Sequence, residues 1–152
     1  MSTGATKQTE LPYPCALEVR DACLCLHVQR AARALARRFD DAFRPLGLTN
    51  GQFSLLMSLN RPEPPDMASV AALLAMDRTT VTAALKPLQR RGLIHIAADL
   101  EDRRARLMTL TPRGRRLLTR AIPIWKRTHR TVEKLLHGRD PNHFRSDLCA
   151  LS

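Results

Sequence analysis

Lysine and arginine side chains gather between Arg78 and Arg120, a stretch in which eleven of them face only three carboxylates. This stretch carries +8 of the chain's formal net charge of +11, whereas residues 1–77 balance eight bases against eight acids. Ammonium and guanidinium groups bind phosphate, and guanidinium groups also pair with guanine edges in the major groove. Because the charge is concentrated in one segment, the sequence predicts that the chain binds nucleic acid.

The side chains best suited to reading bases lie on a predicted helix over residues 78–91. Its apolar residues Val81, Leu85 and Leu88 share one face, and short polar and basic side chains share the opposite face. Small side chains let a helix enter the major groove, where hydroxyl, ammonium and guanidinium groups contact bases or phosphates. Pro87 is expected to bend the last turn. The candidate DNA contacts on this helix are Arg78, Thr79, Thr80, Thr82, Lys86 and Arg90.

A second group of candidates surrounds the tip of a predicted β-hairpin, or wing, with strands over residues 93–97 and 105–110. An arginine on a wing can enter the adjacent minor groove, whose negative potential attracts a guanidinium group. A carboxylate is a poor DNA ligand, so Asp102 is expected to hold a neighbouring arginine or the turn backbone. Each element alone has a simpler interpretation. The basic helix could be an ordinary amphipathic helix exposed to solvent, and the wing tip could be a turn whose charges pair with one another. The wing candidates are Asp102, Arg103, Arg104 and Arg106.

Further helices must hold these two groups in place. Apolar periodicity predicts them over residues 21–43, 49–59, 67–75, 112–136 and 140–149. The short helix over residues 67–75 and the basic helix that follows have helix-turn-helix spacing. Pro123 is expected to kink the long helix that follows the wing. N-caps are predicted at Thr49, Asp66, Asp77, Thr111 and Asp140.

Several short motifs occur in an order typical of one protein family. They are Gly47-Leu48-Thr49, Asp77-Arg78-Thr79-Thr80-Val81-Thr82, Leu88-Gln89-Arg90-Arg91-Gly92-Leu93-Ile94, Asp102-Arg103-Arg104 and Leu110-Thr111-Pro112-Arg113-Gly114. Together they resemble the MarR family of bacterial transcriptional regulators, and the resemblance covers roughly residues 20–137. Each motif alone is weak, but their combined order and spacing are specific.

The resemblance implies a mainly α fold with a small β-hairpin wing. It implies a flexible tail over residues 1–17, a winged helix-turn-helix DNA-binding domain over residues 49–110, and a helical dimerisation domain formed by residues 18–48 and 111–152. In a homodimer, the two recognition helices would enter successive major grooves of a pseudo-palindromic operator. The apolar residues of the first and last helices support a dimer independently, because a small winged domain alone could not cover them.

The expected function is sequence-specific transcription regulation, with repression as the family expectation. The resemblance places the candidates of the basic helix on the groove-reading helix and Arg104 at the minor-groove position of the wing. The alternative is a non-specific architectural DNA-binding protein, which would bind any duplex with similar affinity. An enzyme is not expected, because the sequence has no phosphate loop, no nucleophile elbow and no paired carboxylates at useful spacing.

Release from DNA is expected to depend on a small ligand or on thiol oxidation. Many members of the resembled family respond to phenolic or other aromatic ligands bound between the dimerisation and DNA-binding parts. Phe39, Phe53, Met57 and Trp125 are the candidates for such a pocket, with plain core packing as the alternative.

Thiol oxidation would involve Cys23 and Cys25. Some peroxide-sensing members of the family use a reactive cysteine near the start of the first helix, and Cys25, counted back from Leu48-Thr49, lies close to that place. A reactive thiol needs access and a neighbouring cation, which Arg20 or His27 would supply. The alternative is that both cysteines are small buried apolar residues.

No cofactor or metal is expected, because the five histidines have no compact ligand spacing with cysteines or acids. The N-terminal segment has no apolar signal core, and no window is long enough to span a bilayer, so a cytoplasmic protein is expected. Its four cysteines would then be thiols. The operator, the regulated genes, the effector and the direction of regulation stay open at this stage.

Overall fold

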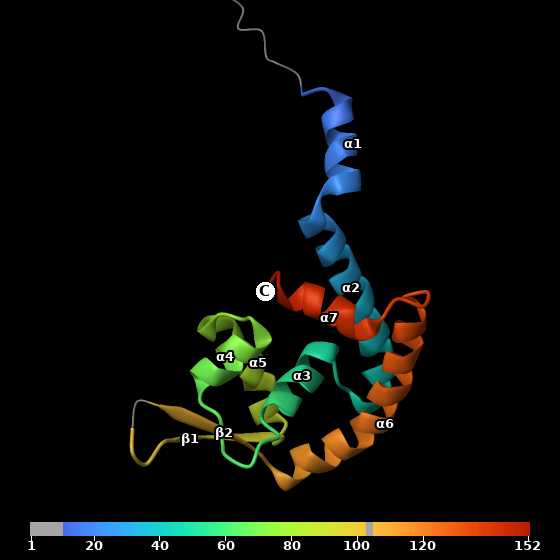
Figure 1. Ribbon diagram of the computed structural model, residues 1–152. Helices are drawn as coiled ribbons and strands as arrows, with labels where there is room; N and C mark the ends of the chain where they lie inside the picture. The colour runs from blue at the N-terminus through green and yellow to red at the C-terminus, as the bar shows by residue number, and fades with distance from the viewer. Residues whose placement is uncertain (1–10, 103–104) are drawn as a thin grey trace, which may run out of the picture. The chain divides into compact units, whose positions relative to one another are not determined.

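Seven α-helices, one 3₁₀ turn and a two-stranded sheet make up the described part of the computed structural model, residues 11–102 and 105–152. Two compact units divide the chain, one ending at Ala34 and one running from Leu35 to Ser152. In chain order the elements are α1 (Tyr13–Ala22), α2 (Leu24–Phe43), the 3₁₀ turn η1 (Arg44–Leu46), α3 (Asn50–Ser58), α4 (Met67–Leu74), α5 (Arg78–Arg90), β1 (Ile94–Ala98), β2 (Arg106–Leu110), α6 (Pro112–Lys134) and α7 (Pro141–Cys149) (Figure 1).

The N-terminal helices correct two sequence predictions. Helix α1 begins at Tyr13, so the predicted flexible tail over residues 1–17 is wrong for its last five residues, while residues 1–10 lie outside the described part. Pro14 stands in the first turn of α1, where a residue without an N–H group is tolerated. The helix predicted over residues 21–43 is interrupted at Cys23, whose extended backbone, with ψ of 106°, separates α1 from α2.

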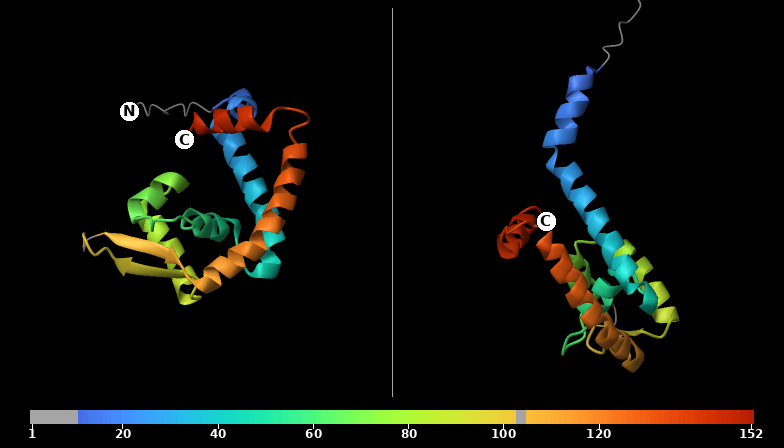
Figure 2. Two further views of the ribbon diagram at one scale, coloured as in Figure 1. Left: turned by 60° about the horizontal axis from the view of Figure 1, so that its bottom comes forward. Right: turned by 90° about the vertical axis from the view of Figure 1, so that its right-hand side faces the viewer.

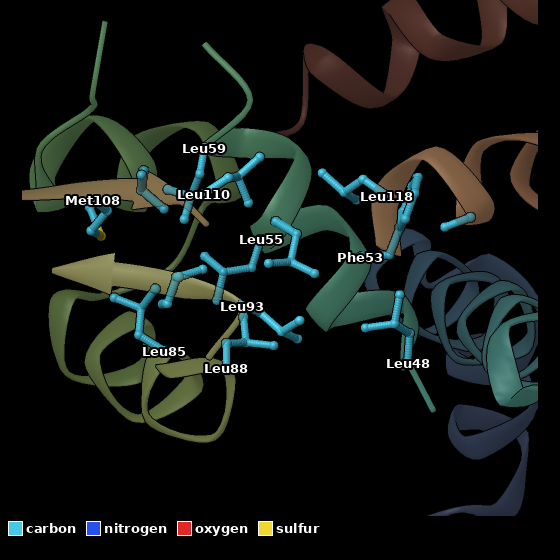
Figure 3. Close-up of a cluster of buried hydrophobic side chains, with 14 of the residues drawn as sticks. Leu48, Phe53, Leu55, Leu59, Leu85, Leu88, Leu93, Met108, Leu110 and Leu118 are labelled. Atoms are coloured by element: carbon cyan, nitrogen blue, oxygen red, sulfur yellow. The ribbon is translucent and has the colours of Figure 1, made fainter. Parts of the chain in front are cut away.

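The core of the second unit is built from apolar faces that the periodicity predicted. Phe53 and Leu56 of α3 are buried as expected, and the ring of Phe53 stacks on Phe43 with centroids 4.6 Å apart. Leucines of α3 and α5 converge with Leu93 and the β2 residues Met108 and Leu110 (Figure 3). Each fully buried side chain of this kind stabilises the fold by about 1.5–3 kcal/mol.

The predicted N-caps are all confirmed, and each is a local hydrogen bond to the first turn of a helix. Thr49 and Gln52 form a reciprocal capping box, in which both N···O distances are 3.2 Å. The other four caps accept a hydrogen bond from a backbone N–H at 2.8–3.1 Å. They are Asp66, Asp77, Thr111 and Asp140.

Helix α6 is fixed directly against the base of the wing. The Thr111 hydroxyl donates a hydrogen bond to the Gly92 carbonyl at 2.7 Å, and the Thr111 N–H donates to the Leu93 carbonyl at 3.0 Å. A Cβ atom at Gly114 would lie 2.1 Å from the Leu93 carbonyl oxygen, so only glycine allows this approach. The helix then continues through Pro123 and changes direction along its length (Figures 1 and 2).

No single helix in the described ranges combines the length and the apolar composition needed to cross a bilayer. Helices α4 and α5 meet that test only when taken together, across a bend of 103°.

Candidate nucleic-acid interface

A tight turn sets the angle between α4 and α5. Ala75 ends α4 in the left-handed region, with φ of 50°, and the Met76 N–H donates to the Ala71 carbonyl at 2.9 Å. Asp77 then caps α5, so that only two residues separate the left-handed turn residue from the first residue of the next helix. The bend of 103° lies in the range of helix-turn-helix motifs.

Helix α5 presents one face to the core and the other to solvent. Val81, Leu85 and Leu88 are at most 1% exposed. The helix runs through Pro87 to Arg90, so the proline leaves the Ala83 carbonyl without its ladder bond and does not end the helix. The six candidate DNA contacts predicted for this helix are all exposed, namely Arg78, Thr79, Thr80, Thr82, Lys86 and Arg90.

The threonine hydroxyls of α5 differ in what they can offer a ligand. The Thr80 hydroxyl donates to Asp77 Oδ2 at 2.7 Å, and the Thr82 hydroxyl donates to the Arg78 carbonyl at 2.7 Å. These two hydroxyls therefore act outward only as acceptors. The Thr79 hydroxyl has no partner within residues 11–102 and 105–152, so it can both donate and accept.

Asp77 keeps a negative charge at the start of α5. Hydrogen bonds from the Thr80 hydroxyl and then from the Thr80 N–H lower the pKa of the Asp77 carboxyl from its ordinary value of 3.8. The carboxylate therefore already occupies the anion position that a helix N-terminus offers. A phosphate would therefore meet exposed side chains of α5, including Arg78 and Thr79, rather than the backbone N–H groups of this N-terminus.

A cleft of about 410 Å³ separates α5 from the wing. Thr82 and Lys86 line it from α5, and Arg106 lines it from β2. The fold thus brings together candidates that the sequence placed on two different elements. Gln89 also lines this cleft. Sequence reasoning missed it, although it lies seven residues after Thr82 and so shares its helical face.

The wing is attached to the segment before α4. Strands β1 and β2 pair antiparallel, with Ile94 opposite Leu110 and Ala98 opposite Arg106. The Met108 N–H donates to the Pro65 carbonyl at 3.1 Å, and Asp66 forms a β-bridge with Leu107. Because Asp66 also caps α4, the wing and the helix-turn-helix share one fixed frame.

The tip of the wing contains three of the four wing candidates. The Asp102 backbone carbonyl accepts a hydrogen bond from the Ala105 N–H at 2.9 Å, while the predicted role of the Asp102 carboxylate stays a prediction. Arg103 and Arg104 lie outside the described residues, so their predicted contacts with the minor groove stay predictions. Arg106 lies at the start of β2 and is exposed.

Arg91 is a positioning residue that sequence reasoning did not single out. Its Nη1 donates to the Gly47 carbonyl at 2.8 Å and lies 3.5 Å from Gln52 Oε1. The end of α5 is thereby attached to the start of α3. No local pattern predicts this contact, because Gly47 and Arg91 are 44 residues apart in the chain.

Three of the four aromatic-pocket candidates line one apolar cavity of about 360 Å³, between α3, α4 and α6. They are Phe53, Met57 and Trp125. Phe39 is not among the lining residues, because it packs in the core with its ring centroid 6.1 Å from that of Phe43. Trp125 also stacks on His129 at 4.8 Å, nearly parallel at 8°.

The thiols of the candidate cysteines in the first unit accept hydrogen bonds from uncharged groups. Cys25 is exposed and its Sγ accepts from Gln29 Nε2 at 3.1 Å, whereas the Cys23 Sγ accepts from the Leu26 N–H at 3.4 Å. Arg20 is paired with Asp21 at 2.6 and 2.8 Å. The His27 Nδ1 atom lies 2.8 Å from the Cys23 carbonyl oxygen. Redox sensing by Cys23 or Cys25 therefore stays a prediction.

Two histidines of the second unit pair with carboxylates. His129 Nε2 lies 3.1 Å from Glu133, and His143 Nδ1 lies 3.4 Å from Asp140. Within the described ranges, no three or more histidine, cysteine or acidic side chains are grouped so that they could hold a metal ion.

Comparison with known proteins identifies the family of this chain. Residues 48–105 match the model of the MarR family. A structure of the Mycobacterium tuberculosis transcriptional regulator MosR in complex with DNA superposes with a TM-score of 0.75 at 36% identity, covering 85% of this chain and 92% of MosR. The chain belongs to the MarR family.

Two further relatives are similar to this chain, one in structure and one in sequence. The chain is also similar in structure to the transcriptional repressor CouR of Rhodococcus jostii, bound to a 23-mer DNA duplex. The TM-score is 0.74 at 27% identity, and the match covers 94% of this chain and 98% of CouR. The transcriptional activatory protein BadR of Rhodopseudomonas palustris is 32% identical over 95 residues, 60% of this chain and 54% of BadR. The chain spans about half the length of the curated relatives it matches.

Membership of the MarR family confirms the predicted fold class, a mainly helical chain with a winged helix-turn-helix and a two-stranded wing. It also confirms that the chain is a regulator rather than an enzyme. The predicted boundaries of the DNA-binding and dimerisation domains stay a prediction.

Proposed function

We propose that this chain is a sequence-specific DNA-binding transcription regulator that acts as a homodimer on a pseudo-palindromic operator. The observation that carries the proposal is the exposed face of α5, which has no acidic residue and faces Arg106 across the cleft. The hydroxyls of Thr80 and Thr82 already donate hydrogen bonds within the protein, so they act as acceptors toward DNA. Lys86 and Arg90 supply positive charge. Gln89 has the amide that suits an adenine edge.

The wing supplies the second contact in this proposal. Arg106 approaches the DNA beside the recognition helix, and Arg103 and Arg104 reach the minor groove. Asp102 keeps the turn in shape. Arg78, at the start of α5, contacts the sugar-phosphate backbone together with Thr79.

Exposed apolar side chains at both ends of the chain support the homodimer. Tyr13, Val19 and Leu24 are exposed in the first unit, and Phe144 and Leu148 are exposed on α7 in the second. Large apolar surface of this kind is typical of an interaction face. A dimer would cover it and would set two recognition helices one DNA turn apart, about 34–36 Å.

The apolar cavity supports release by a small aromatic ligand. Its volume of about 360 Å³ falls within the range of small-molecule sites. Phe53, Met57 and Trp125 would contact the ligand ring. Thiol oxidation at Cys25 is a second candidate signal, supported by the exposure of that side chain. We propose repression as the direction of regulation, by analogy with CouR.

Selection of bound genomic fragments, followed by fluorescence anisotropy over a range of salt concentrations, tests the central proposal. A selected site should bind at least about 10³-fold more tightly than a scrambled duplex of the same length. Equal affinity for both duplexes at every salt concentration would instead identify a non-specific architectural protein. Addition of phenolic ligands or of peroxide to the selected complex then tests the two release signals separately.

A further inference from the structure

A second basic site lies away from the α5 face, where the first half of α6 meets η1 and the end of α5. It is a cavity of about 270 Å³ lined by four arginines, Arg91, Arg113, Arg116 and Arg120. None of its lining residues is acidic, and none of them lines the cleft between α5 and the wing. We refer to it as the arginine cavity.

The charges of the arginine cavity are not compensated by the protein. Within residues 11–102 and 105–152, no carboxylate forms an ion pair with Arg113, Arg116 or Arg120. These residues are spaced three and four apart, so their guanidinium groups share one face of α6 and repel one another. Arg91 is held in place by the Gly47 carbonyl, so it cannot turn away from the other three.

Arg113 lies in the first turn of α6, and this position adds to the electrostatic cost of its charge. The N-terminal end of a helix carries partial positive charge, which disfavours cations and favours anions. Helix α6 has no acid in its first turn, and its cap is the neutral Thr111. A sequence that places uncompensated cations at such an end breaks a local rule of folding, as functional sites do. An anion bound there would be stabilised by the helix and by the guanidinium groups together.

We propose that the arginine cavity binds a phosphate group. Guanidinium groups match phosphate oxygens in a bidentate fashion, which a point charge does not. Leu46, Leu93 and Leu117 provide an apolar wall in the same cavity, against which the carbon skeleton of an organic phosphate packs. The phosphate belongs either to a small phosphorylated ligand or to the backbone of duplex DNA, and the two sources are separable by experiment.

The first arm uses calorimetric titration of the full chain with inorganic pyrophosphate and with adenosine diphosphate. The test variant is the double substitution Arg116→Gln/Arg120→Gln, and the matched control is Arg127→Gln/Arg130→Gln, two exposed positions on later turns of the same helix. If the ligand is a small phosphate, the wild type and the control bind it, and the test variant binds at least about tenfold more weakly. Arg120→Gln alone keeps this arm usable if the double variant does not fold.

The second arm measures the salt dependence of binding to a duplex of random sequence. If the phosphate is that of the DNA backbone, the test variant loses about 0.9 from the log–log slope for each contact removed, and the control does not. Lys86→Ala tests the α5 face separately, so failure of the operator proposal and failure of this one are distinguishable. The proposal is overturned if the test variant matches the control in both arms, or if it changes only the self-association of the chain.

Discussion

Helices α5 and α6 both present basic side chains to solvent, but their N-termini differ. The cap of α5 is Asp77, a carboxylate whose pKa is lowered by Thr80, and the cap of α6 is the neutral Thr111. The arginines of α6 cluster in a cavity near its uncharged start, whereas Lys86 of α5 lies farther along an open face. In the functions proposed above, the cations of α5 form an open surface for a DNA groove, whereas three arginines of α6 form a compact site for one anion.

The largest expected effect is on the attachment of α6. Gly114→Ala places a Cβ atom 2.1 Å from the Leu93 carbonyl oxygen, so the start of α6 must shift and the arginine cavity with it. We expect a loss of about 3 kcal/mol in the free energy of unfolding, measured by urea denaturation. Gly51→Ala is the control, because a Cβ atom there meets nothing within 4 Å. Equal stability of the two variants would contradict the close packing.

The next effect concerns the face of α5. Lys86→Ala removes a cation from the cleft and should weaken DNA binding about tenfold and lower the salt slope by about 1. Thr82→Ala, on the same face, should leave affinity for random DNA nearly unchanged and relax the choice of sequence. Competition binding with a selected operator and its single-base variants measures both. If the two variants behave alike, α5 does not separate phosphate contacts from base contacts.

A smaller effect is expected from the neutral cap of α6. Thr111→Ala removes the acceptor for the Gly114 N–H and the donor to the Gly92 carbonyl. The free energy of unfolding should fall by about 1 kcal/mol. Thr111→Ser keeps both hydrogen bonds and should restore most of the stability in the same denaturation experiment. A serine variant as unstable as the alanine variant would indicate that the methyl group, not the hydroxyl, matters.

The smallest effect is a pH dependence to which two aspartate caps should contribute. Asp66 and Asp77 have pKa values lowered from 3.8, the first mainly by the Ser69 side chain and N–H and the second by the Thr80 hydroxyl and N–H. A carboxyl whose pKa is lowered on folding stabilises the fold above its unfolded pKa and loses that contribution as pH falls through the lower folded value. Melting temperatures should therefore drop below about pH 4, and Asp77→Asn should make that drop shallower. An unchanged pH profile in Asp77→Asn would show that this cap does not titrate in the expected range.

Local patterns predicted the parts of this fold that depend on residues close in sequence. Caps such as Thr49 and Thr111 bond to a residue three positions ahead, so a short motif is enough to find them. The interruption at Cys23 was missed because apolar periodicity continues on both sides of it. Arg91 and its contact with Gly47 were missed because the partners are 44 residues apart.

In the candidate site, too, contacts between residues far apart in sequence could not be predicted. Exposure of the α5 face followed from helical spacing. Phe53, Met57 and Trp125 line one cavity and Phe39 does not, and ligand binding there stays a prediction. The arginines of α6 were counted in the sequence as part of a general positive charge. Their role as a group became visible only when α6 was packed against η1 and the end of α5, which no sequence pattern reports.

The bond from Met108 to Pro65 and the bridge from Leu107 to Asp66 have a mechanical consequence. Strand β2 cannot slide or tilt without displacing Asp66, the N-cap of α4. The wing and the helix-turn-helix therefore move as one rigid body. The orientation of β2 relative to the start of α4 is thus fixed during folding. In the proposed regulator, a signal that releases the DNA would have to turn the wing and the helix-turn-helix together.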